Sequence, residues 1–384
     1  MIYLDHSATT YVDLEVKKEM DRYFSQEFGN PGSMHQAGLT AKEAVKNARE
    51  KIAQILNCQP QEIIFTSGGT ESVNLAIQGL AKEKKQGHII TTKTEHHAVL
   101  ETCKALEKQG FEVTYLDVDK FGMVNPGDVG KNIKPNTILV SIIYANNEIG
   151  TINNIKEISK ITKKHNIPLH TDACQAGLLD LNVGADLVTL NGSKIYGPKG
   201  IGILYKNKNI KLQPIIYGGG QEFNLRSGTE NVPGIVGFAR ALELIQKNKE
   251  QESKRLIQLR DKLIENIKKI PKAILNGHPT ERHPGNVNFS FADIEGESIV
   301  LHLNEQGICA STGSACTSND LEPSHVLIAA GQPAEIAHGS IRFTLGKQTT
   351  EKDIEEVIEK LPKIIESLRK ISPVQLEIKN EIKT

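Results

Sequence analysis

The sequence predicts an α/β protein in which a large domain contains a mostly parallel sheet and a smaller domain is α+β. Three observations lead to this prediction. The chain has 384 residues, more than a single domain usually contains. Up to about residue 250, short β-branched apolar runs alternate with helical patterns, as in a sheet that helices cover on both faces. Charged amphipathic helices around strands follow in the remainder.

The large domain is expected to begin with a helix over 36–57, where apolar residues recur at helical spacing. EIIFTSGGTESVNLAI then has the pattern of a strand, a glycine turn and a helix. The same unit recurs, with helices expected over 97–110 and 155–165. The further strands of this sheet are HIITT, FEVTYLD, TILVSIIYA, IPLHTDA and ADLVTLNG.

The smaller domain is expected to contain helices over 252–269 and 350–371 around the strands NVNFSFAD and SIRFTLG. We assign residues 15–250 to the large domain. Residues 1–14 and 251–384 then form the small domain, which the N-terminal segment completes. The charged stretch KNKEQESK is the candidate junction between the two, and an exposed helix face is the alternative interpretation of its charge.

Charge and composition favour a small-molecule enzyme of the cytoplasm. Lys+Arg and Asp+Glu both total 46, which leaves no net charge to attract nucleic acid or an anionic membrane. MIYLDHSATT has neither the basic start nor the apolar core of a signal peptide, and no apolar run approaches the ~20 residues that span a bilayer. Five cysteines without repeated spacing argue against a disulfide framework or a paired zinc site, so a thiol that matters would act alone.

A glycine turn is the first candidate for ligand binding. In FTSGGTES a predicted strand runs into Gly68, Gly69 and Thr70 and then into a helix, so free N–H groups and the positive helix end point at one spot. The spacing matches neither GxGxxG nor GxxxxGK[ST], which weakens the dinucleotide and P-loop interpretations. An ordinary tight turn capped by Thr70 is the alternative to an anion site.

Lys194 is the candidate for covalent chemistry. It directly follows an apolar strand and lies in NGSKIYGPKG, whose glycines and proline preclude a regular helix, so we expect it to be held inward. A lysine amine has an ordinary pKa near ~10.4, and carbonyl chemistry at neutral pH requires burial or a nearby positive charge to lower it. Schiff-base formation with an aldehyde cofactor is the common reason for such a site.

Asp172 is the candidate partner of that cofactor. It ends the strand IPLHTD at the carboxyl edge, where open α/β sheets bind ligands. A carboxylate there would keep the pyridine nitrogen of a cofactor protonated, so that the ring can draw electrons from the substrate. Helix capping is the alternative role for Asp172, and the pairing with Lys194 favours the cofactor.

Taken together, these motifs resemble the cysteine desulfurases of the NifS/IscS type. These are pyridoxal phosphate (PLP) enzymes with the class V aminotransferase fold, PLP fold type I. The resemblance extends from YLDHSATT to about residue 375. The motifs in family order are FGNPGSMH, FTSGGTES, TKTEHHAV, NNEIGT, TDACQA, SKIYGPKG, YGGGQE, RSGTEN, STGSACTS, LEPSHVL and SIRFTLG.

The resemblance assigns roles around the cofactor ring. It implies that Lys194 forms the Schiff base with PLP and that Asp172 contacts the pyridine nitrogen. Gln175 would bond the ring hydroxyl. His96 would stack on the ring and assist proton transfer, and Asn147 would also lie at the cofactor.

The resemblance also assigns the phosphate and substrate contacts. Gly69 and Thr70 would belong to the phosphate cup, and Thr229 would reach the phosphate from the neighbouring subunit, which implies a homodimer. Asn147 and Arg342 would hold the substrate carboxylate, a task that suits the fork of a guanidinium. The segment before the lysine departs from the family, which usually has histidine at Ser193 and often serine at Asn191; these two and Gly192 are nevertheless expected at the phosphate.

Cys316 is the candidate nucleophile. It lies in STGSACTSND, where small and polar residues predict an exposed, mobile loop at about 309–322. A free thiol has a pKa near ~8.5, so a modest positive influence ionises it at neutral pH. The resemblance implies that this thiolate takes the sulfur of cysteine as a persulfide. The other cysteines, Cys58, Cys103, Cys174 and Cys309, are expected to be small buried residues, with Cys174 near the cofactor.

The predicted activity is conversion of L-cysteine to L-alanine, with the sulfur passing to Cys316 and then to a protein of iron–sulfur cluster assembly or of thiolation. A selenocysteine lyase or a class V aminotransferase is the alternative, and STGSACTS disfavours simple transamination. A dinucleotide-dependent oxidoreductase lacks its fingerprint, and a non-catalytic sulfur-relay scaffold would not need Lys194, Asp172 and His96. EIKNEIKT ends without the tail by which the IscS-type branch docks its scaffold, so the sequence does not select the acceptor.

Overall fold

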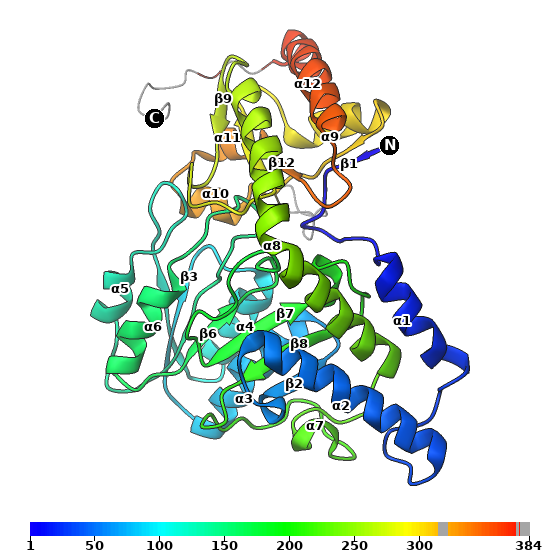
Figure 1. Cartoon of the computed structure of the whole chain (residues 1–384). Coiled ribbons are helices and arrows are strands. Elements are labelled where there is room, and N and C mark those ends of the chain that lie inside the picture. Colours follow the sequence, from blue (N-terminus) through cyan, green and yellow to red (C-terminus); the bar gives the residue numbers. More distant parts are fainter. Residues whose placement is uncertain (314–321, 374–375, 377–384) are drawn as a thin grey trace.

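The larger part of the chain, the lower part in Figure 1, is built on a seven-stranded sheet with the strand order β2-β8-β7-β6-β5-β3-β4. The structure, a computed structural model, describes residues 1–313, 322–373 and 376. Neighbouring strands are parallel except at β8, which is antiparallel to both β2 and β7. The strands are β2 (Ile63–Thr66), β3 (His88–Thr92), β4 (Glu112–Leu116), β5 (Thr137–Ser141), β6 (Leu169–Asp172), β7 (Leu187–Asn191) and β8 (Gly202–Lys206).

This sheet confirms the predicted α/β fold and adds a strand that was not predicted. β8 follows β7 after residues 192–201, too few for the crossover that a parallel neighbour would require, so the chain turns back as a hairpin. Alternate residues of β2 point to opposite faces, with Ile63 and Phe65 in one apolar cluster and Ile64 in another. The sheet is therefore buried on both faces.

Helices supply the two layers that cover the sheet. The predicted helix over 36–57 corresponds to α2, and the one expected over 97–110 ends earlier, before the chain turns at Gly110 with φ of 92°. The helices of this part are α1 (Leu14–Ser25), α2 (Gln36–Leu56), α3 (Gly69–Lys84), α4 (His97–Glu107), α5 (Pro126–Lys131), α6 (Ile155–Lys164) and α7 (Gln221–Asn224). Two 3-10 turns, η1 (Pro60–Glu62) and η2 (Gly192–Lys194), connect strands to their neighbours.

The smaller part contains an antiparallel sheet with the order β12-β10-β9. Its strands are β9 (Ala273–Leu275), β10 (Asn286–Phe291) and β12 (Ser340–Thr344), and its helices are α9 (Gly296–Glu305), α10 (His325–Ala329), α11 (Ala334–Ala337) and α12 (Glu351–Ile371). The N-terminal strand β1 (Ile2–Tyr3) pairs in parallel with β11 (Ile308–Cys309). Leu4 is buried in the same apolar cluster as Phe289 and Phe343, so the N-terminal segment belongs to this core.

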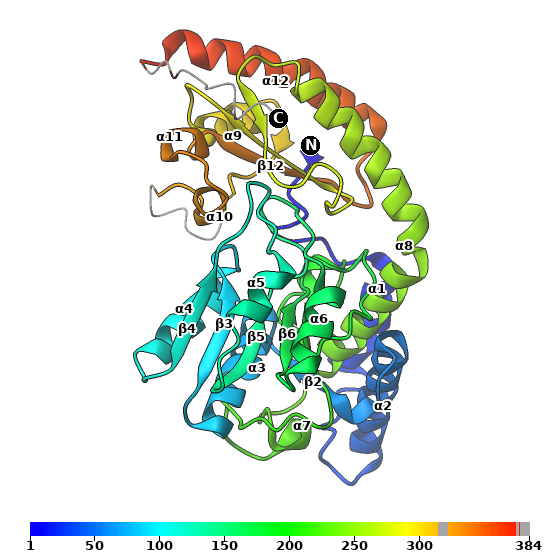
Figure 2. The same ribbon diagram turned by 90° about the vertical axis from the view of Figure 1, so that its left-hand side faces the viewer.

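One helix, α8 (Val232–Ile267), extends along both parts (Figure 2). Its first half packs Phe238 and Leu242 into the core of the large sheet, and its second half packs Leu256 and Leu263 into the core of the small one. The helix expected from residue 252 therefore begins at Val232, because KNKEQESK continues the helix as a largely exposed face. Within the described residues, no helix combines the length and the apolar character needed to cross a membrane.

Candidate active site

Lys194 and Asp172 lie at the ends of adjacent strands. Asp172 ends β6 and pairs with Thr189 of β7, and Lys194 follows β7 in the η2 turn. A Cβ added to Gly192 would lie 2.7 Å from the Pro198 carbonyl oxygen, so the tight turn before Lys194 requires glycine. The two side chains thus start from the same carboxyl edge of the sheet, as the sequence predicts.

The N-terminal segment crosses this edge. The Lys194 amine donates a hydrogen bond to the Ala8 carbonyl, and Gln175 Nε2 donates to the Ser7 carbonyl at 3.1 Å. The Thr10 N–H donates to the Ser193 carbonyl at 2.8 Å. These contacts were not predicted, because sequence patterns do not pair a coil segment with turns more than 160 residues away.

The glycine turn before α3 packs against both strand ends. A Cβ added to Gly69 would touch Asn191 at 3.6 Å and would lie 2.7 Å from Cys174 Sγ, so a larger residue here would have to displace the Cys174 thiol. Asn191 Oδ1 accepts hydrogen bonds from the N–H and the hydroxyl of Ser193, each at 3.2 Å. Thr70 is exposed on the first turn of α3.

This donor set fits PLP. The first N–H groups of α3 have no partner inside the helix, and together with the positive end of the helix they would suit an anion near Asn191. Lys194 offers an amine to an aldehyde, and Asp172 offers a carboxylate to a ring nitrogen. A cofactor that carries a phosphate, an aldehyde and a pyridine ring matches all three features.

Asp172 is almost entirely buried, and its Oδ1 accepts the Cys174 N–H at 3.0 Å. Burial, followed by the charge of Asp172, raises the pKa of the Cys174 thiol well above its usual value. Cys174 is therefore a neutral thiol. Burial also raises the pKa of the Cys58 and Cys103 thiols to about 12, in keeping with the inert roles expected for them.

His96 forms the N-cap of α4. Its Nδ1 accepts the Ala98 N–H at 3.0 Å, which orients the ring and places the proton of the neutral form on Nε2. The preceding Glu95 is fully buried, and its Oε1 accepts the Ile143 N–H at 2.8 Å. Burial raises the pKa of Glu95 to about 8, so this carboxyl holds a proton at neutral pH. No pattern in the sequence predicts that proton.

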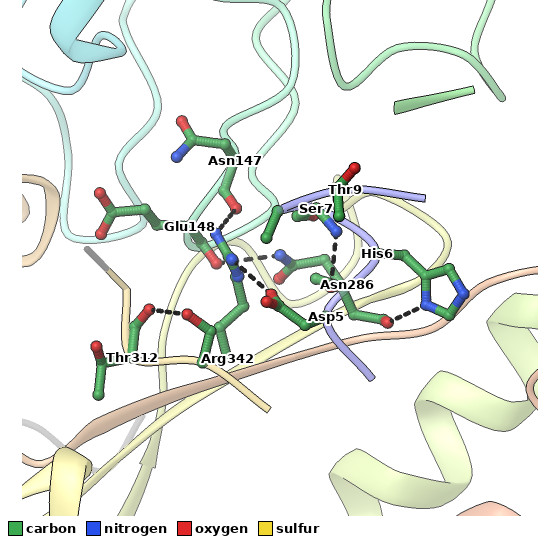
Figure 3. A network of polar contacts seen from close by, with 12 residues as sticks. Asp5, His6, Ser7, Thr9, Asn147, Glu148, Asn286, Thr312 and Arg342 are labelled. Carbon is green, nitrogen blue, oxygen red and sulfur yellow. Dashed lines mark hydrogen bonds and ion pairs between the residues drawn. The ribbon is translucent and has the colours of Figure 1, made fainter. Parts of the chain in front are cut away.

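Arg342 lies on β12 and is 3% exposed. Its guanidinium donates to the Asn147 carbonyl at 2.9 Å and to Asp5 Oδ1 at 2.8 Å (Figure 3). In the described part of the chain its Nε has no hydrogen-bond partner. Figure 3 shows the Asn147 side chain directed away from the guanidinium. Asn147 and Arg342 are thus adjacent through the backbone of Asn147, and Asp5 is a partner of Arg342 that sequence reasoning missed.

Thr229, which is expected to act in a second subunit, lies at the surface of this one. The same segment is tied to α3 by the ion pair between Arg226 and Glu71 at 2.9 Å. Cys316 lies outside the described residues.

The comparisons with known proteins agree with this geometry. The model of the family described as Aminotransferase class-V matches residues 2–357. A protein of Methanosarcina thermophila named cysteine desulfurase IscS is 53% identical, over 97% of this chain and 94% of its own length. The chain belongs to the cysteine desulfurases of the class-V aminotransferase family. The family resemblance seen in the sequence is thereby confirmed.

The fold of this desulfurase is also similar to solved structures. A NifS-like protein has a TM-score of 0.90 and 39% identity, over 96% of this chain and 100% of its own. A structure described as SspA in complex with cysteine has a TM-score of 0.80 and 37% identity, over 90% and 99%. Cysteine desulfurases and class-V aminotransferases are PLP enzymes, in agreement with the donor set found here.

Proposed function

We propose that this cysteine desulfurase converts L-cysteine to L-alanine and transfers the sulfur to Cys316 as a persulfide. The meeting of Lys194, Asp172 and the glycine turn at one sheet edge carries the proposal. The similar SspA structure is described as a complex with cysteine, which supports this substrate. Because the similar proteins are named desulfurases, a selenocysteine lyase or a class V aminotransferase is not favoured.

PLP is the proposed cofactor, and it would act as an electron sink that weakens the Cβ–S bond of the substrate. Lys194 would carry it through the amine, and Asp172 would hold the ring nitrogen. Because the Cys174 thiol is neutral, it adds no negative charge beside Asp172. The residues proposed to contact PLP are Gly69, Thr70, His96, Asn147, Asp172, Gln175, Asn191, Gly192, Ser193, Lys194 and, from a second subunit, Thr229.

The remaining site residues would handle the substrate. Arg342, already oriented by Asp5, would bind the substrate carboxylate together with Asn147. Lys194 and His96 would move protons at the substrate carbons, and Nε2 is the ring atom of neutral His96 that carries a proton.

The sulfur acceptor is the Cys316 thiolate. It would form a bond to the substrate sulfur while the Cβ–S bond of the substrate breaks and the electron pair stays with the carbon. That carbon takes a proton and leaves in alanine, so the thiol is oxidised to a persulfide and the carbon is reduced. The persulfide then passes to an iron–sulfur scaffold or a thiolation protein, between which the chain itself does not select.

Cys316→Ala tests the proposal. With L-cysteine and a reductant, we expect alanine release to fall roughly a hundred-fold, because the variant lacks the proposed sulfur acceptor. The mutant should keep the yellow colour of the cofactor. Cys309→Ala, which replaces a cysteine of the same part of the chain, should release alanine at the wild-type rate. Equal turnover by all three proteins would show that Cys316 is not the acceptor.

We further propose a cytoplasmic homodimer that shares the phosphate site through Thr229, without nucleic acid or membrane partners. The surface position of Thr229 supports this arrangement. Hybrids of Lys194→Ala and Thr229→Ala subunits are expected to contain one site with both residues intact, and this site should retain cofactor as the wild type does. Thr280→Ala, at another exposed threonine, is the control. If Thr229→Ala never changes cofactor retention, the shared site is wrong.

The division of the chain at residue 250 remains a proposal as well. In the structure that position lies inside α8, and the two apolar cores meet different halves of this helix. We therefore propose that residues 15–250 form the PLP-binding domain and that residues 1–14 and 251–384 form the second domain.

A further inference from the structure

Two short stretches that flank the Cys316 segment converge on one buried carboxylate. Gly313 is the last described residue before residues 314–321, and Ser324 follows them closely. Ser324 Oγ donates a hydrogen bond to Glu148 Oε2 at 2.5 Å. A Cβ added to Gly313 would lie 2.5 Å from the same Oε2 and 3.5 Å from the Ser324 Cβ. Glu148 thus contacts the chain on both sides of the segment that carries Cys316.

The backbone of Glu148 is fixed by amides on both sides. Its N–H donates to Asn146 Oδ1 at 2.9 Å. Its carbonyl accepts from the side chains of Asn286 and Asn288, each at 3.0 Å, and Figure 3 shows Asn286 pointing at this carbonyl. The carbonyl of the preceding Asn147 accepts a hydrogen bond from Arg342. Glu148 is therefore bonded in the chain to Asn147, which together with Arg342 borders the proposed substrate site.

The stretch after the segment has a second attachment. His325 Nε2 forms a hydrogen bond of 2.9 Å with the Glu95 carbonyl, directly before His96. The rings of His325 and His97 lie 4.6 Å apart. Burial is the main cause that lowers the pKa of both histidines, so they are neutral at neutral pH and place no cation beside Glu148. The 322–325 stretch therefore rests on the start of α4 as well as on Glu148.

Burying the charged carboxylate of Glu148 costs free energy, because the group loses its hydration. Glu148 is 3% exposed, and burial raises its pKa. The charge of Arg342 and the hydroxyl of Ser324 offset part of this cost. An apolar side chain would fill the same volume without this free-energy cost. It could not, however, accept the hydrogen bond of the Ser324 hydroxyl.

We propose that Glu148 is a positioning residue that ties Gly313 and Ser324, described residues before and after 314–321, to the backbone next to Asn147, and that sulfur transfer to Cys316 depends on this contact. The inference rests on the proposed function, since it assigns Glu148 to the sulfur-transfer step. It separates two tasks of neighbouring residues: Asn147 faces the substrate, and Glu148 serves the acceptor.

The test separates substrate binding from sulfur transfer in the PLP-loaded enzyme. Binding of L-cysteine is followed by the change in cofactor absorbance, and transfer by alkylation of the persulfide on Cys316 and mass spectrometry in a single turnover. In Glu148→Ala and Ser324→Ala we expect transfer to slow by ~10–100-fold, since a displacement of about 1 Å costs up to that factor. The cysteine concentration at half-saturation should change less than about threefold, a difference of about 0.65 kcal/mol.

Rescue and control variants make the result specific. Glu148→Gln keeps an oxygen that accepts the Ser324 hydroxyl and should transfer sulfur within about threefold of the wild type. Combining Glu148→Ala with Ser324→Ala should be no slower than the slower single variant, because both single variants lack the contact between Glu148 and Ser324. Glu101→Ala, at an exposed carboxylate of α4 that pairs with Lys104, should have no effect.

Wild-type transfer in both alanine variants would overturn the inference. So would a loss confined to cysteine binding, which would assign Glu148 to the substrate site. Ser324→Ala removes the hydroxyl that donates to Glu148 and that also caps α10 through the Leu327 N–H, and it keeps the test valid if Glu148→Ala does not fold. Failure of the proposed function looks different: Cys316→Ala would then form alanine at the wild-type rate, whatever the Glu148 variants do.

Discussion

Lys194→Ala is expected to lower alanine release from L-cysteine by about 10⁴-fold, because one amine would hold the cofactor and also move a proton. Lys194→Arg should be equally inactive, since a guanidinium keeps the charge but cannot form the covalent bond. The measurements are steady-state alanine release and the mass of the hydride-reduced protein. The reduced wild type should carry an adduct at position 194, and neither variant should.

Lys199→Ala is the matched control for this loss. Lys199 also donates to the N-terminal segment, through the Thr10 carbonyl at 2.8 Å. If release of that segment were the cause of inactivity, both alanine variants would fail. An active Lys194→Ala enzyme, or an adduct on another lysine, would contradict the assignment of the cofactor lysine.

Asp172→Asn is expected to lower alanine release by roughly 10²–10³-fold, as loss of one preorganised electrostatic partner does. The amide still has an oxygen for the Cys174 N–H, so the local backbone should keep its geometry. What disappears is the negative charge that would keep a ring nitrogen protonated. The measurements are the rate of alanine release and the cofactor content of the purified protein.

Asp186→Asn serves as the control for Asp172→Asn. Asp186 precedes β7 and accepts the Leu169 N–H at 3.0 Å, at the opposite end of β6 from Asp172. The control is expected to keep wild-type activity even where it loses some stability. Equal losses in the two variants would assign Asp172 a structural role only.

Much of the large sheet could be predicted because each strand is marked by its own residues. HIITT, for example, coincides with β3. β8 and the start of α8 could not be predicted in this way. GILYK is a short strand whose direction depends on the hairpin after Lys194. A charged stretch such as KNKEQESK looks the same in a linker as on the exposed face of a continuous helix.

The site shows the same division between local and distant information. Asp172 ends a strand of the large sheet, and Lys194 and Gly69 each follow another, so the rule for carboxyl edges brings the three residues together. The contacts of Ala8 with Lys194, of Asp5 with Arg342 and of Glu148 with Ser324 join positions that are 176 to 337 residues apart. Such pairs follow from how the two cores pack, which local periodicity does not encode.

The unbroken course of α8 has a consequence for changes in chain length. A single residue inserted between Leu242 and Leu256 would rotate everything beyond it by about 100° and shift it by about 1.5 Å along the helix axis. The two apolar stripes of α8 would then face different directions, and Arg342 could no longer reach the Asn147 carbonyl. Insertions in the surface loops leave this alignment intact. The number of residues in this helix is therefore itself part of the active-site design, because it sets how the two apolar cores are aligned.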